Sequence, residues 1–235
     1  MKQIFYTLII WAALFSACKK SDIQVTPLAS INIVNATVNS TVVKANFTNN
    51  TGVFGTTSLS VGYGGNTVYP LPAGNNIPVT ITATADTLHP VYYVPISAAS
   101  GDYYSLYLCG QTGAIESILM KDNFTTRQDS TFGIRIVNLS FNSGPINMTL
   151  STATTTNEIA NIAYKTVSDF KAYPCKATSP AVTFQLRDAA TGKLLGSQAF
   201  TVGTMPRFHN VTLVLRGMVG GTGSAALGLQ MVKNY

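Results

Sequence analysis

Charged residues are scarce in this sequence. Only 10% of its 235 residues are Asp, Glu, Lys or Arg, and the formal charge of +6 is dispersed along the chain. A basic cluster with interleaved aromatic residues, the usual footprint of nucleic-acid binding, is missing. We therefore expect no nucleic acid among the partners of this protein.

Cysteine and histidine are scarcer still. The two histidines, His89 and His209, are isolated, and the three cysteines show no spacing typical of a metal site. We therefore expect no metal and no cofactor. Cys109 and Cys175 fall in different halves of the chain and are expected to be separate, partly buried thiols rather than a disulfide.

Long apolar runs are missing, except for one short stretch near the N-terminus. Lys2 precedes an apolar segment from Ile4 to Leu14. That segment is shorter than the roughly 20 residues of a permanent transmembrane helix, and it fits a cleaved secretory signal. It ends in Leu-Phe-Ser-Ala-Cys, which resembles the lipobox of bacterial lipoproteins, although Phe15 stands where leucine is usual.

The lipobox resemblance implies that residues 1–17 are a signal peptide and that Cys18 becomes an acylated N-terminus. Two or three acyl chains anchor a protein stably, so residues 18–28 would form a short lipidated tether. We predict a lipid-anchored protein of the outer membrane, at the cell surface or on the periplasmic face. The alternative is an ordinary secretory signal followed by a chance cysteine.

Two halves of the chain are related in sequence. Residues 31–40 (INIVNATVNS) and 134–143 (IRIVNLSFNS) are identical at six of ten positions, at a spacing of 103. Further matches follow in the same order: 104–110 with 211–217, and 115–124 with 226–235. A period near 100 residues is too long for a solenoid unit and indicates a duplicated domain.

The duplication predicts a first domain at 29–124, a polar linker at 125–130 and a second domain at 131–235. Within each repeat, apolar and polar residues alternate over short runs separated by Gly- and Pro-containing turns, the pattern of strands with one buried face. About seven short strands in about 100 residues are typical of an immunoglobulin-like sandwich. The expected fold is all-β, with two tandem immunoglobulin-like antiparallel β-sandwich domains.

The second repeat resembles a bacterial family, domain of unknown function 4397. The resemblance lies in IRIVNLS at 134–140, IAYKTVSDF at 162–170, TFQLRDAATGKLL at 183–195, and the strand and glycine turn at 212–220. The first repeat matches more weakly. The resemblance implies paired sandwich domains on secreted or surface proteins, often lipoproteins of the Bacteroidetes type, and it brings no catalytic residues.

No catalytic set stands out. Glycosidase chemistry needs two carboxyl groups about 5–9 Å apart in a cleft. Two carboxylate pairs are the nearest candidates: Asp122 with Asp129, and Asp169 with Asp188. The G-x-S-x-G motif of a nucleophile elbow is missing. We predict that the chain is not an enzyme, with a hydrolase as the remote alternative.

Tyrosines on strands are the better candidates for a binding surface. Adjacent strand residues face opposite ways, so one residue of each tyrosine doublet is expected to point outward. An exposed row could stack on sugar rings or on a protein partner. The alternative is cross-strand packing within the sheet. The candidate ligand-binding residues are Tyr92, Tyr93, Tyr103, Tyr104 and Tyr107.

Two tripeptides resemble the D-S/T-x acceptor of O-glycosylation in Bacteroidetes, with Thr87 and Ser130 as the acceptors. The function we expect is a non-enzymatic binding or adhesion module for glycan or protein at the cell surface. The alternative is a structural spacer or accessory subunit of an outer-membrane complex. A binder should expose a contiguous aromatic patch, a spacer should not, and a hydrolase should show converging carboxylates.

Overall fold

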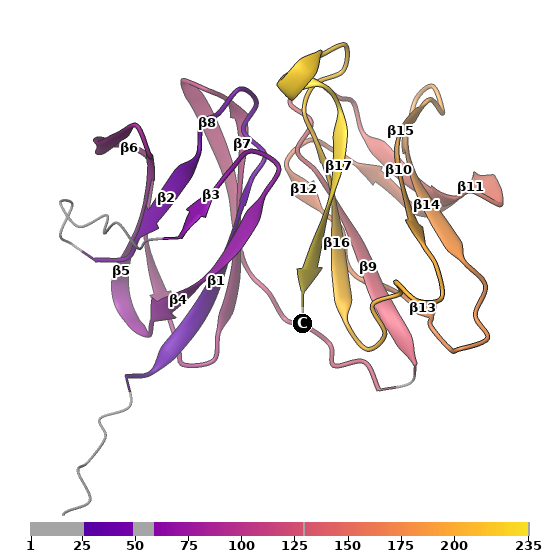
Figure 1. The fold of residues 1–235 in the computed structure, drawn as a ribbon, viewed down its shortest axis with the longest axis horizontal. Helices are drawn as coiled ribbons and strands as arrows, with labels where there is room; N and C mark the ends of the chain where they lie inside the picture. Colours follow the sequence, from indigo (N-terminus) through magenta and orange to yellow (C-terminus); the bar gives the residue numbers. More distant parts are fainter. Residues whose placement is uncertain (1–25, 49–58, 129, 235) are drawn as a thin grey trace, which may run out of the picture.

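The computed structural model describes residues 26–48, 59–128 and 130–234, and its regular structure is almost entirely β (Figure 1). Within these ranges the one helical element is a single 3-10 turn, η1 (Gly223–Ala225), in the connection between the last two strands. The predicted signal peptide, Cys18 and Asp129 lie outside the described residues. The prediction of an all-β fold is confirmed.

Each half of the chain folds into its own set of strands. The described part of the first half contains β1 (Leu28–Asn35), β2 (Val43–Asn46), β3 (Ser60–Val61), β4 (Asn66–Pro72), β5 (Gly74–Ala83), β6 (Asp86–Ala98), β7 (Tyr103–Gln111) and β8 (Ala114–Lys121). The second half contains β9 (Thr131–Asn138), β10 (Ile146–Leu150), β11 (Ala153–Ile162), β12 (Thr166–Val167), β13 (Lys171–Pro174), β14 (Val182–Asp188), β15 (Leu194–Phe200), β16 (Asn210–Arg216) and β17 (Gly228–Asn234).

Each domain is a sandwich of two sheets. In the first domain the outer sheet has the order β3-β2-β5-β6 and the inner sheet β4-β1-β7-β8. In the second domain the inner sheet has the order β12-β9-β16-β17, with β13 also paired to β9, and the outer sheet β11-β10-β14-β15. Strands of one half pair only within that half, so the predicted linker falls between the two sandwiches.

Most strand pairs are antiparallel, but the central pair of each inner sheet is parallel. β1 runs parallel to β7, and β9 runs parallel to β16. Parallel neighbours need a long crossover connection. Here most of the domain provides that connection, because between β1 and β7, and between β9 and β16, the chain forms the whole outer sheet and an edge of the inner one.

The period-two pattern places one apolar face of each inner sheet inside its own sandwich. Ile31 and Ile33 of β1 pack in the first core with Ile81 of the outer sheet. The second core contains Ile134 and Ile136 of β9 and a group of rings in edge-to-face or tilted contact. Those rings are Phe132, Tyr173, Phe184 and Phe200. Burying each such side chain contributes about 1.5–3 kcal/mol.

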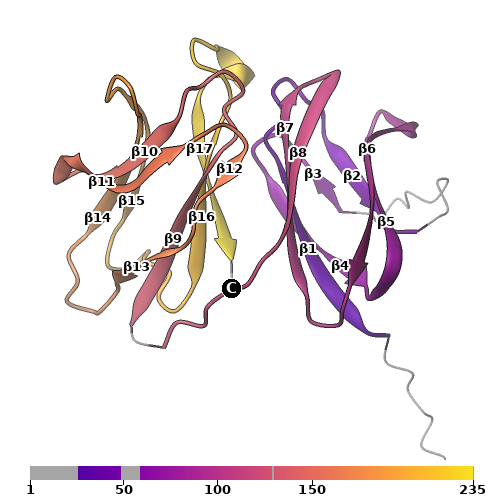
Figure 2. The ribbon, with the colours of Figure 1, turned by 180° about the vertical axis from the view of Figure 1, so that it is seen from behind.

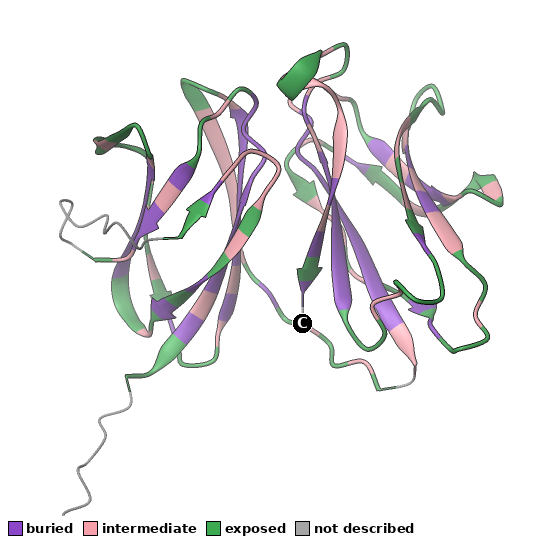
Figure 3. Ribbon diagram, viewed as in Figure 1, coloured by how far each residue is buried: buried purple, intermediate pink, exposed green. Residues whose placement is uncertain are grey.

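The opposite faces of the two inner sheets form a third core, between the domains. Figures 1 and 2 show the two sandwiches side by side with their inner sheets facing each other. Figure 3 shows buried residues along β1, β7, β9 and β16. Each domain contributes four fully buried apolar residues: Val34, Ala36, Tyr107 and Cys109 from the first, and Val137, Leu139, Val214 and Val232 from the second. The molecule is therefore a stack of four sheets with three cores.

A buried ion pair joins the domains within this third core. Arg135 on β9 donates from Nη1 to Asp122 Oδ1 at 2.6 Å, and neither side chain is more than 3% exposed. The other guanidinium nitrogens donate to the Tyr107 hydroxyl at 3.0 Å and to Thr212 Oγ1 at 2.8 Å. Ser105 donates to the second carboxylate oxygen of Asp122. Such extra hydrogen bonds are what makes a buried ion pair tolerable.

Two further sets of side-chain contacts join the domains. Glu116 on β8 accepts hydrogen bonds from Lys165 Nζ at 2.6 Å and from the Tyr164 hydroxyl at 3.2 Å. The Arg216 guanidinium of the second domain lies 4.6 Å from the ring centroid of Tyr63 in the first. These contacts add to the ion pair in holding one sandwich against the other.

Strand register corrects one part of the predicted repeat alignment. Lys121 pairs with Tyr104 on β7, and Lys233 pairs with Val211 on β16. Lys233 is therefore the counterpart of Lys121, at a spacing of 112 (233 − 121) rather than the 111 of the sequence comparison. The match of 115–124 with 226–235 is wrong by one residue, because chance identities at Met and Asn outweighed the longer loop that precedes β17.

We expect the Arg135→Met variant to lose about 3–5 kcal/mol of unfolding free energy, because Asp122 is left charged, buried and unpaired. Urea denaturation measures this loss. The matched control is Lys121→Met, which breaks the partly exposed pair with Asp102 and should cost far less, because solvent screens an exposed ion pair. Equal losses of unfolding free energy in the two variants would contradict the larger contribution expected of the buried pair.

Candidate functional site

The five candidate tyrosines do not form one exposed row. Tyr107 is fully buried between the domains, and Tyr103 is only 7% exposed. Tyr92 and Tyr104 are partly buried against the first core, and Tyr93 is 60% exposed. The expectation of outward-pointing tyrosines is wrong for Tyr103 and Tyr107, because the second domain covers the face of the sheet on which they lie.

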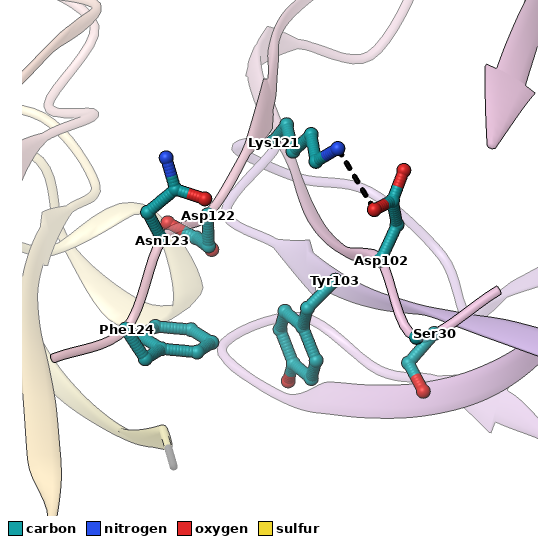
Figure 4. Close-up of a pocket in the computed structure, with 8 residues that line it drawn as sticks. Ser30, Asp102, Tyr103, Lys121, Asp122, Asn123 and Phe124 are labelled. Carbon is teal, nitrogen blue, oxygen red and sulfur yellow. Dashed lines mark ion pairs between the residues drawn. The ribbon is translucent and has the colours of Figure 1, made fainter. Parts of the chain in front are cut away.

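Two of these tyrosines nevertheless border hollows at the end of the first domain where β1 begins, here called the tether end. The larger one, the end hollow, has a volume of about 440 Å³ (Figure 4). Its lining includes Ser30, Asp102, Tyr103, Lys121, Asn123 and Phe124. A neighbouring side hollow of about 390 Å³ is lined by Tyr104 and Asn75 and shares Asp102 and Lys121 with the end hollow.

An ion pair stands between the two hollows. Lys121 Nζ lies 2.8 Å from Asp102 Oδ1, and the other carboxylate oxygen accepts a hydrogen bond from the backbone N–H of Ala99 at 3.0 Å. The Lys121 ammonium, followed by that backbone hydrogen bond, holds the pKa of Asp102 below its usual range. The same pairing raises the pKa of Lys121. Both groups are charged at neutral pH, and their charges cancel locally.

Aromatic rings form the opposite side of the end hollow. The Tyr103 and Phe124 rings meet edge to face at a centroid distance of 5.0 Å, and Figure 4 shows them beside each other with the ion pair above them. Phe124 is in turn 6.1 Å from Phe170 of the second domain, over which the Arg135 guanidinium lies at 4.5 Å. The network between the domains therefore fixes one wall of the hollow.

A larger groove opens between the domains at the same end. It has a volume of about 840 Å³, and Tyr103 lines both this interdomain groove and the end hollow. The rest of its lining includes Val68, Met205, Pro206, Met231 and Lys233. The groove is thus mainly apolar, whereas the end hollow is mainly polar.

The carboxylates with shifted pKa values are all shifted downward. Lys165 lowers the pKa of Glu116, and Lys171 lowers that of Glu158. Hydrogen bonds from His89 and from Thr191 lower the pKa values of Asp86 and Asp188. A general acid working near neutral pH needs a raised carboxyl pKa. Within the described ranges, no three His, Cys, Asp or Glu side chains gather as a metal site would require.

The predicted modification sites lie apart from the hollows. Thr87 is partly buried near the start of β6, where the Asp86 carboxylate accepts hydrogen bonds from the backbone of Leu88 and His89. Ser130 is partly buried in the linker, has a φ of +56°, and accepts a hydrogen bond at its carbonyl from Cys175 N.

Both described cysteines are free, as expected. Cys109 lies between the domains and Cys175 in the second core. Among the described residues, no helix is long and apolar enough to cross a membrane. Comparison with protein-family models and with curated proteins finds no match to this chain, so the resemblance to domain of unknown function 4397 stays a prediction.

The sequence analysis identified Tyr103 and Tyr104 but missed their polar neighbours. Asp102 and Lys121 meet because β7 and β8 pair with Tyr104 opposite Lys121. No local motif encodes that register. The one available signal was the pair of polar segments, Gly-Asp before β7 and Lys-Asp-Asn from the last residue of β8 onward, which a hairpin brings to the same end.

We expect Cys109 and Cys175 of the folded chain to resist labelling by a thiol reagent such as DTNB at pH 8, because they are at most 3% exposed. Burial raises the pKa of Cys109 to about 11 from 9.0. Its contribution to stability is therefore complete below pH 9 and is lost as the pH rises toward 11, because the unfolded thiol ionises first. Fast labelling of the native chain at pH 8 would contradict this burial.

Proposed function

We propose that this chain is a lipid-anchored protein of the bacterial outer membrane that binds a glycan or a protein without catalysing a reaction. We place the ligand in the end hollow, beside Tyr103. The observation that carries the proposal is the combination found there: two packed aromatic rings, a charge-balanced ion pair and further polar side chains around one concave space.

The chemistry of the end hollow favours a neutral, hydroxyl-rich ligand. Asp102 accepts hydrogen bonds, Lys121 donates them, and the Asn123 amide does both. Because the charges of Asp102 and Lys121 cancel, the hollow offers no net electrostatic attraction to either an anion or a cation. Apolar ring edges beside a few fixed polar groups are the usual construction of a small-molecule site. Among the two proposed ligand classes, these features support the glycan.

The anchor is part of the proposal. The lipobox-like run before Cys18 supports acylation, and the described chain leaves the first sandwich at Leu28, only ten positions (28 − 18) further on. We further propose that the sandwiches are immunoglobulin-like and that the second is related to domain of unknown function 4397. Paired sandwich domains on an outer-membrane lipoprotein fit that family.

The pairing of the nearby carboxylates supports the proposal that the protein binds its ligand without catalysis. The two nearest to the end hollow, Asp102 and Asp122, already pair with Lys121 and Arg135. A carboxylate held ionised by a cation is a poor proton donor at neutral pH. A hydrolase at this site would need a second, unpaired carboxyl group.

A structural spacer or accessory subunit of an outer-membrane complex is the second candidate. The third core favours it, because eight fully buried apolar side chains and a buried ion pair hold the two domains in one orientation. A spacer depends on that rigidity alone, whereas a binder also depends on the end hollow.

We expect Asn123→Ala to weaken ligand capture about tenfold, the effect of losing about 1.4 kcal/mol of hydrogen bonding. The measurement is crosslinking capture from intact cells, with glycan and protein products analysed separately. The matched control is Asn157→Ala on β11, an exposed residue of the second domain, which should bind like the unchanged chain. Equal capture by both variants would contradict a ligand in the end hollow and favour the spacer.

We expect Cys18→Ala to release the protein from the membrane fraction, because the acyl chains have no other site of attachment in the predicted tether. Mass spectrometry of the unchanged chain should show acyl mass on the peptide that begins at Cys18. A Cys18→Ala chain that stays in the membrane fraction, together with an unchanged chain that carries no acyl mass, would contradict the anchor.

A further inference from the structure

At the same end of the molecule as the tether end, one loop of the second domain exposes apolar side chains. From here on, the name tether end covers this end of both domains. This loop, residues 201–209, joins β15 to β16, and it presents Val202 at 55% exposure and Phe208 at 43%. Leu28, where β1 begins at the same end of the molecule, is 48% exposed. Single exposed apolar residues are ordinary on protein surfaces, so these three gain weight only through the charges and the anchor at the same end.

The backbone of the loop holds Phe208 in place. Its φ is +66°, in the left-handed region that bulky residues rarely adopt. The Phe208 N–H donates to Thr131 O at 2.9 Å, and Arg207 Nε donates to Cys175 O at 2.8 Å. Thr201 and Thr204 close the start of the loop with hydrogen bonds to each other. The ring is therefore exposed on an ordered loop.

Positive charge surrounds the loop. Arg127 bonds to Asn210 at the start of β16, Lys176 follows β13, and Lys233 lies on β17 opposite Val211. Together with Arg207 these are four cations, and none of them forms an ion pair with a carboxylate of the described residues. Asp102 and Asp122, which line the end hollow, are already paired with Lys121 and Arg135.

The predicted anchor leaves the molecule at the same end. The first described residues lead away from β1 at the lower edge of Figure 1, where the linker and the start of β9 also lie. Ten extended residues reach at most about 36 Å. A lipid on Cys18 would therefore hold this end, and not the opposite one, close to the membrane.

We propose that the tether end is a second membrane contact, in which the 201–209 loop docks on an anionic lipid surface. Phe208 and Val202 enter the interfacial layer, and Arg127, Lys176, Arg207 and Lys233 face the lipid headgroups. Apolar side chains flanked by cations are the combination that binds anionic membranes. The inference rests on the proposed lipid anchor, which brings this end to the membrane. It goes beyond ligand binding because it specifies the orientation of the two domains relative to the membrane.

The test uses a single fluorescent reporter. The only tryptophan of the chain, Trp11, lies in the predicted signal peptide, so the Phe208→Trp variant gains an indole at the proposed contact. We expect vesicles of brominated phosphatidylglycerol to quench its emission about twofold or more, and vesicles of brominated phosphatidylcholine to quench it far less, because the contact needs anionic headgroups. Leu88→Trp, at an exposed position on the outer sheet of the first domain, is the matched control and should not be quenched.

Charge is tested in the same assay. Arg207→Gln with Lys233→Gln, in the Phe208→Trp background, should reduce the quenching by about half or more, whereas Lys193→Gln in the β14–β15 turn should leave it unchanged. Absent quenching, equal quenching by both lipids, or equal quenching at positions 88 and 208 would overturn the proposal. Ligand capture and its dependence on Asn123 are measured separately, so failure of either proposal can be recognised.

Discussion

The contact between the two inner sheets, together with the buried Arg135–Asp122 ion pair, is the constraint on which the rest of the structure depends. It buries the second face of both inner sheets, which turns two sandwiches into one four-layer body. A buried charge pair adds little net stability but strongly penalises any arrangement that separates its members. The pair therefore acts mainly on specificity, since separating the domains would remove the Asp122 and Tyr107 partners of Arg135 together.

That constraint also explains which parts of the fold were predictable from the sequence. Alternating apolar residues such as Ile31 and Ile33 identify a strand and one buried face, and the repeat identifies two domains. They do not tell what covers the other face. Tyr107 was therefore expected at an exposed surface, whereas it is buried between the domains; Cys109 is a free thiol as predicted, and it too lies between the domains. The repeat did contain a hint, because Arg135 stands where the first domain has Asn32.

The candidate site was less predictable, for a physical reason. The end hollow depends on the register of β7 with β8 and on the path of the chain after β8, which brings Phe124 against Tyr103. Register and linker path are set by long-range packing, so composition and spacing pointed to tyrosines and could not identify Asp102, Lys121 or Asn123. The same packing brings the tether, the end hollow and the 201–209 loop to one end of the molecule. Rigid docking of the domains thus links anchorage, ligand binding and orientation at the membrane.

Differential scanning calorimetry tests this rigid docking most directly. If the third core joins the sandwiches into one cooperative unit, the two domains should unfold together in a single transition. The calorimetric enthalpy of that transition should equal its van't Hoff enthalpy. Two separated transitions, or a calorimetric enthalpy about twice the van't Hoff value, would contradict the account, because the domains would then unfold independently.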